Sequence, residues 1–317
     1  MSGGTRRLFR GETTINFYGR RNVGFIASGL LVLITIISLF AQGLNLGIDF
    51  KGGVAFEVPV QGSISIDVVE DVLKSEGVLD DGVKIQTLKS ETESRIRIQL
   101  GDQEPQKVTA IQTALAEKAN LTVNDVSVST VSSTWGRNIT MKAVNALLVF
   151  FLVVSIFISF RFEWRMAASA IAAMAHDVAI SVGLYSVLGL EVTPATVVAF
   201  LTILGFSLYD TIVVFDKVHD NTSRFSGSKV SYGDVVNVSM NQVLMRSLNT
   251  SLAAVLPVLS LLVLGSGVFG AVALREFALA LLVGLATGAY SSIYIATPLL
   301  GLLKERSAQY VSGRGQL

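Results

Sequence analysis

Cysteine is absent from this chain of 317 residues, which excludes disulfide bonds and thiolate metal sites. Histidine is scarce, and neither His176 nor His219 has a second histidine at the spacing of a metal site. The chain also lacks the G-x-x-x-x-G-K-[ST] phosphate loop, so nothing in it predicts hydrolysis of ATP or GTP. We therefore expect no metal and no cofactor, and we expect energy to come from an ion gradient or from a partner.

Charged residues are few as well, at 15% of the chain, whereas about a quarter of the residues in a soluble domain are charged. Hydrophobic residues make up 51% and gather in six windows of 18 to 28 residues. Each window is long enough to cross about 30 Å of hydrocarbon as a helix. The sequence therefore predicts an α-helical membrane protein with six transmembrane helices, at 23–46 and, within a region 141–303, at 143–160, 166–190, 192–215, 247–274 and 277–303.

Basic residues predict the orientation, because lysine and arginine near a span favour the cytoplasmic side. Five arginines precede the first window, so segment 1–22 is expected in the cytoplasm. That window has the basic start of a secretory signal, but its uncharged stretch exceeds the roughly 7 to 15 residues of a signal core, which favours an uncleaved anchor. Counting spans then places 217–246 and the tail 304–317 in the cytoplasm. We expect a multi-pass protein of the plasma (inner) membrane with both termini cytoplasmic.

Residues 47–140, between the first two windows, have the composition of a soluble domain, and the span count puts them outside the cytoplasm. Segments rich in alternating apolar residues predict strands, and two segments with one apolar face predict helices. Their order is that of a ferredoxin-like α+β domain on the extracytoplasmic (periplasmic) side. The elements run β-α-β-β-α-β, at 51–60, 67–76, 83–88, 95–100, 105–119 and 121–131.

A pair of glycines marks the start of this domain. Gly52 and Gly53 follow Asp49 and Lys51, at the connection between the first span and the first strand. Glycine permits a tight change of direction there. We predict that these four residues form the junction between the membrane helices and the soluble domain.

One carboxylate stands deep inside an apolar window. Asp210 lies eighteen residues into an uncharged stretch that begins at Val192. A charge at that depth costs several kcal/mol unless it is protonated, paired or facing water, so an intramembrane acid favours a functional interpretation. The alternative is that Asp210 reaches toward the headgroups beside Asp216 and Lys217, but an aspartate side chain is short. We therefore expect Asp210 to handle a proton or an ion.

Three further ionisable residues accompany it. His176 and Asp177 lie near the middle of the third window, where a proton relay and ordinary hydrogen bonding between helices are equally open interpretations. Arg246 opens the fifth window at about the depth of Asp210. It could extend to lipid phosphate, or it could neutralise Asp210 until a conformational change separates the two. The second interpretation predicts a switch.

Several longer motifs are similar to those of the SecD/SecF family of protein-export membrane proteins, and in particular to SecF. The resemblance covers nearly the whole chain. The Asp-Thr pair of the family falls on Asp210 and Thr211, and the arginine that opens its fifth span falls on Arg246; Tyr209 stands where the family often has Asn or Asp. The motifs are GIDFKGG (47–53), AHDV (175–178), LTILGFSLYDTIVVFDKV (201–218), RSLNTS (246–251) and FALALLVGLATGAYSSIYIATPLL (277–300).

The resemblance implies a function. Members work with SecD, as two chains or one fused chain, in a twelve-span unit similar to the resistance-nodulation-division transporters. They assist export of unfolded polypeptide through the SecYEG translocon, with SecA and YajC as further candidate partners; membrane lipid is expected to surround the chain, and no nucleic acid is expected. The proton gradient is the implied energy source. Asp210 would gain and lose the proton, Arg246 would bias its charge, and SecD would supply a further acid.

We therefore predict an auxiliary subunit that uses the proton gradient to promote late steps of polypeptide translocation, and not an enzyme. Coupling would run from Asp210 through the junction at 49–53 to the soluble domain. One alternative is half of a small-molecule exporter, although a soluble domain of about ninety residues is small for that class. A second is an intramembrane aspartyl protease using Asp177 and Asp210, but the G-x-G-D motif is missing. A third is a passive scaffold for the translocon.

Overall fold

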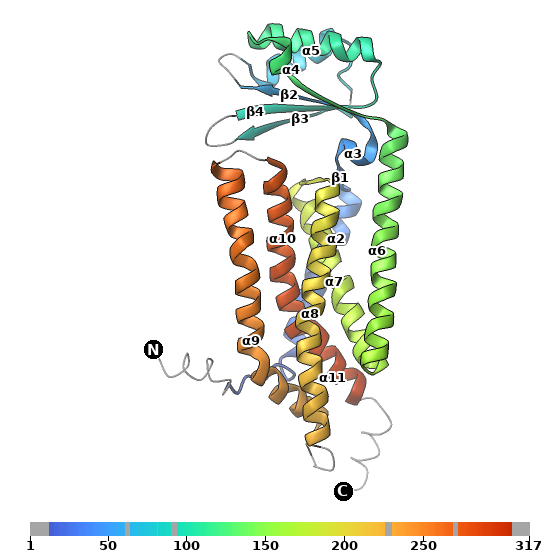
Figure 1. Ribbon diagram of the computed structural model, residues 1–317, viewed down its shortest axis with the longest axis vertical. Helices are drawn as coiled ribbons and strands as arrows, with labels where there is room; N and C mark the ends of the chain where they lie inside the picture. Colours follow the sequence, from blue (N-terminus) through green and yellow to red (C-terminus); the bar gives the residue numbers. More distant parts are fainter. Residues whose placement is uncertain are drawn as a thin grey trace.

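The computed structural model describes residues 13–60, 64–80, 82–89, 94–225, 230–268 and 272–305. Within them, six helices are long and apolar enough to cross a membrane, and they stand side by side as a bundle with a small sheet domain beyond one end (Figure 1). The protein is a mostly helical, multi-pass membrane protein. Its membrane helices are α2 (Arg21–Ala41), α6 (Ser133–Arg161), α7 (Trp164–Leu188), α8 (Pro194–Arg224), α9 (Tyr232–Ser260, continued by a π-helical segment, Leu261–Val268) and α10 (Val272–Ser291, continued by the π-helical segment η3, Ser292–Ala296, and by α11, Thr297–Glu305).

The first helix is shorter than the window 23–46. It ends at Ala41, because Gly43 adopts a φ of +70° and turns the chain out of the helix. Asn45–Leu46 then form a two-residue strand, β1, which pairs in parallel with β6 (Glu191–Val192) between α7 and α8. The last residues of the window therefore belong to the connection with the soluble domain.

Other helices are longer than their apolar windows. The soluble domain ends with β5 at Val131 rather than at 140, since Ser132 caps α6 by accepting a hydrogen bond from the Trp135 amide. The expected segment 217–246 is mostly helical, because α8 continues to Arg224 and α9 starts at Tyr232, after the cap residue Ser231. α11 reaches Glu305; residues 1–12 and 306–317 of the expected N-terminal segment and tail lie outside the described residues. Polar helical turns thus extend the bundle past the hydrocarbon.

The soluble domain consists of four antiparallel strands with two helices on one face (Figure 1). Its elements follow the expected order β-α-β-β-α-β, and the strand order in the sheet is β3-β4-β2-β5. The core contains Val54, Phe56 and Val58 of the central strand, which alternate toward the helices and are fully buried. The elements are β2 (Gly53–Pro59), α4 (Ile66–Ser75), β3 (Lys84–Lys89), β4 (Ser94–Leu100), α5 (Pro105–Ala119) and β5 (Ser127–Val131).

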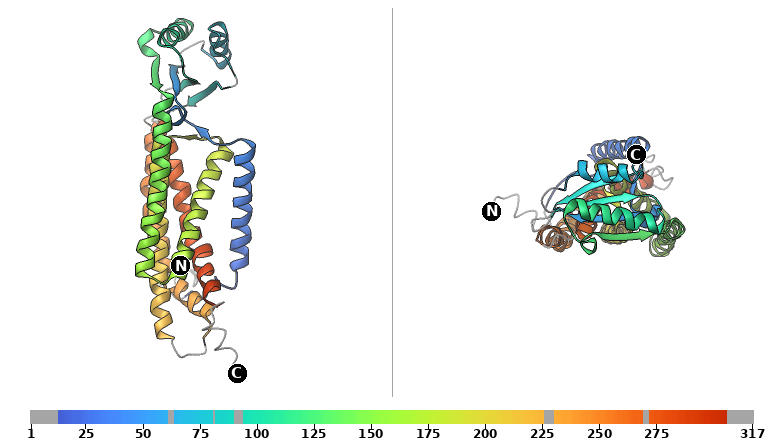
Figure 2. Two further views of the ribbon diagram at one scale, coloured as in Figure 1. Left: turned by 90° about the vertical axis from the view of Figure 1, so that its right-hand side faces the viewer. Right: turned by 90° about the horizontal axis from the view of Figure 1, so that it is seen from above.

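Helices α7, α8 and α10 form the interior of the bundle, whereas α2, α6 and α9 lie at its periphery (Figures 1 and 2). Two glycines on α10 bring it close to α8. A Cβ atom at Gly284 would overlap the Ile203 side chain, and one at Gly288 would lie 3.0 Å from the Ser207 Cβ. Small residues at such spacing let helix backbones approach closely. This close contact brings together the polar side chains of the inner helices.

Candidate functional site

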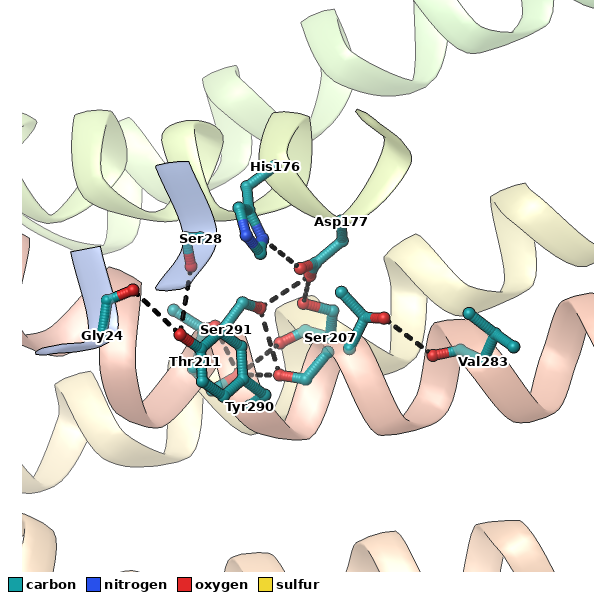
Figure 3. Close-up of polar contacts among 12 residues, drawn as sticks. Gly24, Ser28, His176, Asp177, Ser207, Thr211, Val283, Tyr290 and Ser291 are labelled. Atoms are coloured by element: carbon teal, nitrogen blue, oxygen red, sulfur yellow. Dashed lines mark hydrogen bonds and ion pairs between the residues drawn. The ribbon is translucent and has the colours of Figure 1, made fainter. Parts of the chain in front are cut away.

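Asp177 lies where the three inner helices meet. It is 0% exposed on α7, and its Oδ2 accepts hydrogen bonds from the hydroxyls of Ser207 on α8 (2.5 Å) and Ser291 on α10 (2.8 Å). Its other oxygen, Oδ1, is 3.1 Å from His176 Nδ1 (Figure 3). The carboxylate therefore holds together three helices at the centre of the bundle.

The His176 ring extends these contacts toward α2. It lies beside Tyr290 of α10, with ring centroids 6.3 Å apart, and the Tyr290 hydroxyl donates to the Gly24 carbonyl on α2 (2.9 Å) (Figure 3). That hydroxyl is also 3.1 Å from the Ser28 hydroxyl. His176 Nε2 is buried and has no hydrogen-bond partner among the described residues. The imidazole therefore lies between the Asp177 carboxylate and the Tyr290 ring.

Asp210 lies farther along α8 and is 1% exposed. The hydroxyl of Ser247 on α9 is 2.6 Å from its Oδ1 and 2.7 Å from its Oδ2. This hydroxyl sits between both carboxylate oxygens and can donate to only one of them at a time. The partner that α9 offers to this deep carboxylate is therefore a neutral hydroxyl.

Hydroxyl groups connect the surroundings of the two acids. Thr211, which follows Asp210, has its hydroxyl 3.1 Å from that of Ser292, and Ser292 Oγ lies 3.4 Å from the Ser207 carbonyl. Ser207 in turn donates to Asp177. A hydroxyl can both donate and accept, so these residues can exchange hydrogen-bond partners when the charge of either acid changes. We call these residues the polar network: His176, Asp177, Ser207, Asp210, Thr211, Ser247, Ser291 and Ser292.

A π-helical segment places two consecutive serines in this network. Ser291 ends α10 and Ser292 begins η3, where the Thr297 hydroxyl donates to the Ser292 carbonyl five residues earlier (2.7 Å). Ser291 reaches Asp177, while Ser292 reaches Thr211. Such local widening of a helix occurs frequently at functional sites.

The structure does not bring Arg246 and Asp210 together. The Arg246 side chain is exposed on α9, and among the described residues no ion pair joins it to Asp210. The next residue, Ser247, occupies the position expected for the arginine. Consecutive residues of a helix point about 100° apart, so a serine that faces α8 turns the preceding arginine away.

The predicted junction residues form a closely packed turn. Asp49 and Lys51 lie in a one-turn helix, α3 (Ile48–Lys51), and the following glycines have φ values of +79° (Gly52) and +125° (Gly53). A Cβ at Gly52 would lie 2.5 Å from the Ser133 Cα at the start of α6, and one at Gly53 would overlap the Leu100 carbonyl. Both glycines are therefore required by backbone conformation and by space.

Sequence reasoning missed the serines of the network. These serines lie inside apolar windows, where a hydroxyl can bond to the backbone of its own helix and so does not indicate a functional role: Ser207, Ser247, Ser291 and Ser292. The signal that could have found them is the pair Ser291-Ser292 and the serine one turn before Thr211. By contrast, His176, Asp177, Asp210 and Thr211 were all singled out, and the structure places all four in the network.

Family models match most of the chain. Residues 110–306 match the family described as protein export membrane protein SecD/SecF, C-terminal, a range that contains the whole polar network. Residues 37–64 match the SecD/SecF GG motif, which contains the glycine pair of the junction.

Named relatives align over nearly the whole chain. Protein translocase subunit SecF of Mycobacterium tuberculosis is 42% identical over 308 residues, with 95% of this chain and 70% of the relative covered. The SecF subunit of Streptomyces coelicolor is 40% identical over 304 residues, covering 96% and 80%. The crystal structure of SecDF from Thermus thermophilus superposes with a TM-score of 0.82 at 33% identity, covering 95% of this chain. This chain spans 41% of that SecDF chain.

Proposed function

Because the chain belongs to the SecD/SecF family of protein-export membrane proteins, we propose that it is a subunit of a protein-translocation machine and works beside a SecD partner. The relative named SecDF, in which a region similar to this chain is part of one longer polypeptide, supports the partnership. The SecYEG translocon and an unfolded polypeptide are the further partners in this proposal, with SecA and YajC as candidates.

Orientation follows from charge in this proposal. The arginines before α2 favour the cytoplasm for that end of the bundle, and the sheet domain lies beyond the opposite end (Figure 1). The sheet domain is then extracytoplasmic, where it can meet the emerging polypeptide. Its strand order, with the first and third strands of the domain in the middle, supports the ferredoxin-like assignment.

We propose the proton gradient as the energy source, with no cofactor and no bond-breaking chemistry. The observation that carries this proposal is the burial of Asp177 and Asp210 among hydroxyl partners inside membrane helices. In such surroundings a carboxylate without a cationic partner carries its charge only at considerable cost. One proton that crosses 100 mV supplies about 2.3 kcal/mol, which is enough to drive a change of helix contacts.

Proton uptake at Asp210 would change the contact between α8 and α9. While the carboxylate is charged, Ser247 can donate to either oxygen. Once it is protonated, Asp210 carries a donor of its own and requires an acceptor, so the Ser247 hydroxyl must turn or move. Thr211, Ser292 and Ser207 form the path by which this change reaches Asp177. Helix displacement would then act on the soluble domain through the junction at 49–53.

Arg246 has a different role in this proposal from direct neutralisation in the conformation described. Its exposed side chain faces away from α8, toward the side on which a partner chain or lipid would lie. We propose that it meets an acidic residue of the SecD half, and that it influences Asp210 through the neighbouring Ser247.

The test is gradient-dependent completion of secretion in membrane vesicles that carry this chain with its SecD partner. We expect Asp210→Asn to lose the gradient-dependent part of export, with Asp177→Asn and Arg246→Met reduced as well. The matched control is Asp220→Asn, which changes an exposed acid on the same helix α8 and should export like wild type. If Asp210→Asn assembles and exports like wild type, the buried carboxylate is structural and the passive scaffold replaces the proton-driven subunit.

A further inference from the structure

We propose that Glu191 is a positioning residue that holds the soluble domain onto the membrane helices through Arg97 and Gln99 of β4. This inference rests on the proposed function in one respect, since Glu191 makes the contact that a proton-driven movement would release. The contact itself can be tested without export.

Glu191 is a buried acid between two membrane helices. It lies in the short strand β6, which joins α7 to α8, and is 2% exposed. Its Oε1 accepts a hydrogen bond from Gln99 Nε2 (2.9 Å) and forms an ion pair with Arg97 Nη2 (3.4 Å). Both partners belong to the soluble domain, so one carboxylate bridges the two parts of the molecule.

The surrounding backbone holds this carboxylate in place. β6 pairs with β1 in the linker between α2 and the soluble domain, and the Gly47 amide donates to the Val192 carbonyl (3.0 Å). A Cβ at Gly47 would overlap Glu191 Oε1, so a larger residue there would force the carboxylate to move. Asn45 donates to the Gly189 carbonyl (3.0 Å) at the end of α7. Backbone contacts on both sides thus fix the position of Glu191 at the interface.

Glu191 also lies at the start of the helix that carries Asp210. α8 begins at Pro194, after the cap residue Thr193, and continues without interruption past Asp210. Asp210 is sixteen residues from Pro194, which is about 24 Å at 1.5 Å per residue. A shift of α8 at the polar network therefore reaches the strand that carries Glu191 along one continuous helix.

Two features indicate a contact that can open. Arg97 has a second anion within its own domain, because its Nε lies 3.8 Å from Glu57 Oε1 on β2. It would therefore keep an acidic partner after leaving Glu191. Gln99 also borders a cavity of about 280 Å³ between the domain and the junction, lined by residues that include Lys51, Gly52 and Lys84. Close packing does not fix this side of the interface, which leaves the polar contact to define the position.

The absence of cysteine allows a direct test. Val123 in the soluble domain and Leu188 at the end of α7 are 39% and 59% exposed, so Val123→Cys with Leu188→Cys gives a background in which this chain has two thiols only, and the partner is used in a cysteine-free form. Spin labels on this background, in the full chain with its SecD partner in lipid vesicles, report the distance between domain and bundle by pulsed electron paramagnetic resonance. We expect Glu191→Gln to give a several-fold larger fraction of long distances than the background.

Two further variants keep the test decisive. Gln99→Leu removes the hydrogen bond to Glu191 without altering the membrane helices, and it should also increase the long-distance fraction. Glu57→Gln is the matched control, because Glu57 contacts Arg97 only from within the soluble domain, and its loss should not increase the long-distance fraction. Unchanged distances in both Glu191→Gln and Gln99→Leu would overturn the proposal, as would an equal shift in Glu57→Gln.

The two proposals fail in different ways. If Asp210→Asn exports normally while Glu191→Gln still lengthens the distances, the interface contact stands and the proton-driven role falls. If Asp210→Asn abolishes gradient-dependent export while Glu191→Gln changes no distance, the proton-driven role stands and the positioning role of Glu191 falls.

Discussion

Asp210 and Glu191 are both almost fully buried, but their partners differ in kind. Asp210 meets the hydroxyl of Ser247 inside the bundle, whereas Glu191 meets an arginine and an amide at the domain interface. A hydroxyl can donate to a charged carboxylate or accept from a protonated one, so it tolerates either state. A guanidinium only donates, so it stabilises the charged state alone.

This difference assigns different tasks to two regions of one helix. The α8 segment around Asp210 and Thr211 is suited to gain and lose a proton, because the Ser247 hydroxyl can turn from donor to acceptor. The strand before α8 is suited to keep its charge and to hold a neighbouring domain. A change of charge at one site can therefore become a change of position at the other.

The largest expected effect on export comes from giving Asp210 a cationic partner. We expect Ser247→Lys to keep Asp210 charged and to remove the whole gradient-dependent part of export. Ser247→Ala should retain a reduced part, because the carboxylate can still titrate without its hydroxyl, and Ser247→Thr should export like wild type. Export in vesicles with and without the gradient gives this order. Gradient-dependent export by an assembled Ser247→Lys protein would contradict the view that Asp210 must lose its charge.

A double-mutant cycle measures how strongly Glu191 and Arg97 interact at the domain interface. Arg97→Gln and Glu191→Gln should each weaken docking of the soluble domain by about 1 to 3 kcal/mol, since each leaves a buried partner unsatisfied. The double variant should cost less than the sum of the two, because the residues are in contact. The docked fraction, from the labelled distances, measures each term.

The matched control for this cycle is the ion pair between Lys107 and Glu76, 3.6 Å apart on the surface of the soluble domain. Its loss should leave docking unchanged, since exposed pairs contribute little. Strict additivity of Arg97→Gln and Glu191→Gln would show that the two residues act independently.

The sequence predicted these two regions unequally. Asp177 and Asp210 are conspicuous, because a charge inside an apolar window has few structural explanations. Glu191 is not, since a single acid between two spans looks like an ordinary loop residue. Arg246 lies at the right depth for Asp210, but depth along a helix says nothing about rotation around it, and Ser247 faces α8 instead. Helix ends were misplaced for a related reason: hydropathy detects the hydrocarbon-spanning part, while α6 and α8 continue as polar turns.

The contact between α8 and α10 should matter as much as the polar groups that it positions. We expect Gly284→Ala to lower the free energy of unfolding by about 1 to 3 kcal/mol, because the added methyl overlaps the Ile203 side chain. Gly205→Ala is the control on α8, where nothing lies within 4 Å of the new Cβ, and it should be neutral or slightly stabilising. Thermal unfolding of the purified protein in detergent measures both. Equal effects of the two substitutions would contradict close packing at Gly284.

The smallest expected effect concerns a third charge beside the interface. Lys84 contacts Asn45 of β1, and burial, followed by the neighbouring Lys51, lowers the pKa of its ammonium below 10.5, while Glu191 opposes that shift. The unfolded chain therefore binds more protons than the folded protein between the lowered pKa and about 10.5, so stability rises as pH increases through that range. Lys84→Met should flatten this rise, whereas Lys118→Met, an exposed lysine on α5, should leave it in place. Thermal unfolding of the three proteins across the alkaline range makes the comparison. A rise that persists unchanged in Lys84→Met would mean that the interface does not disfavour this ammonium.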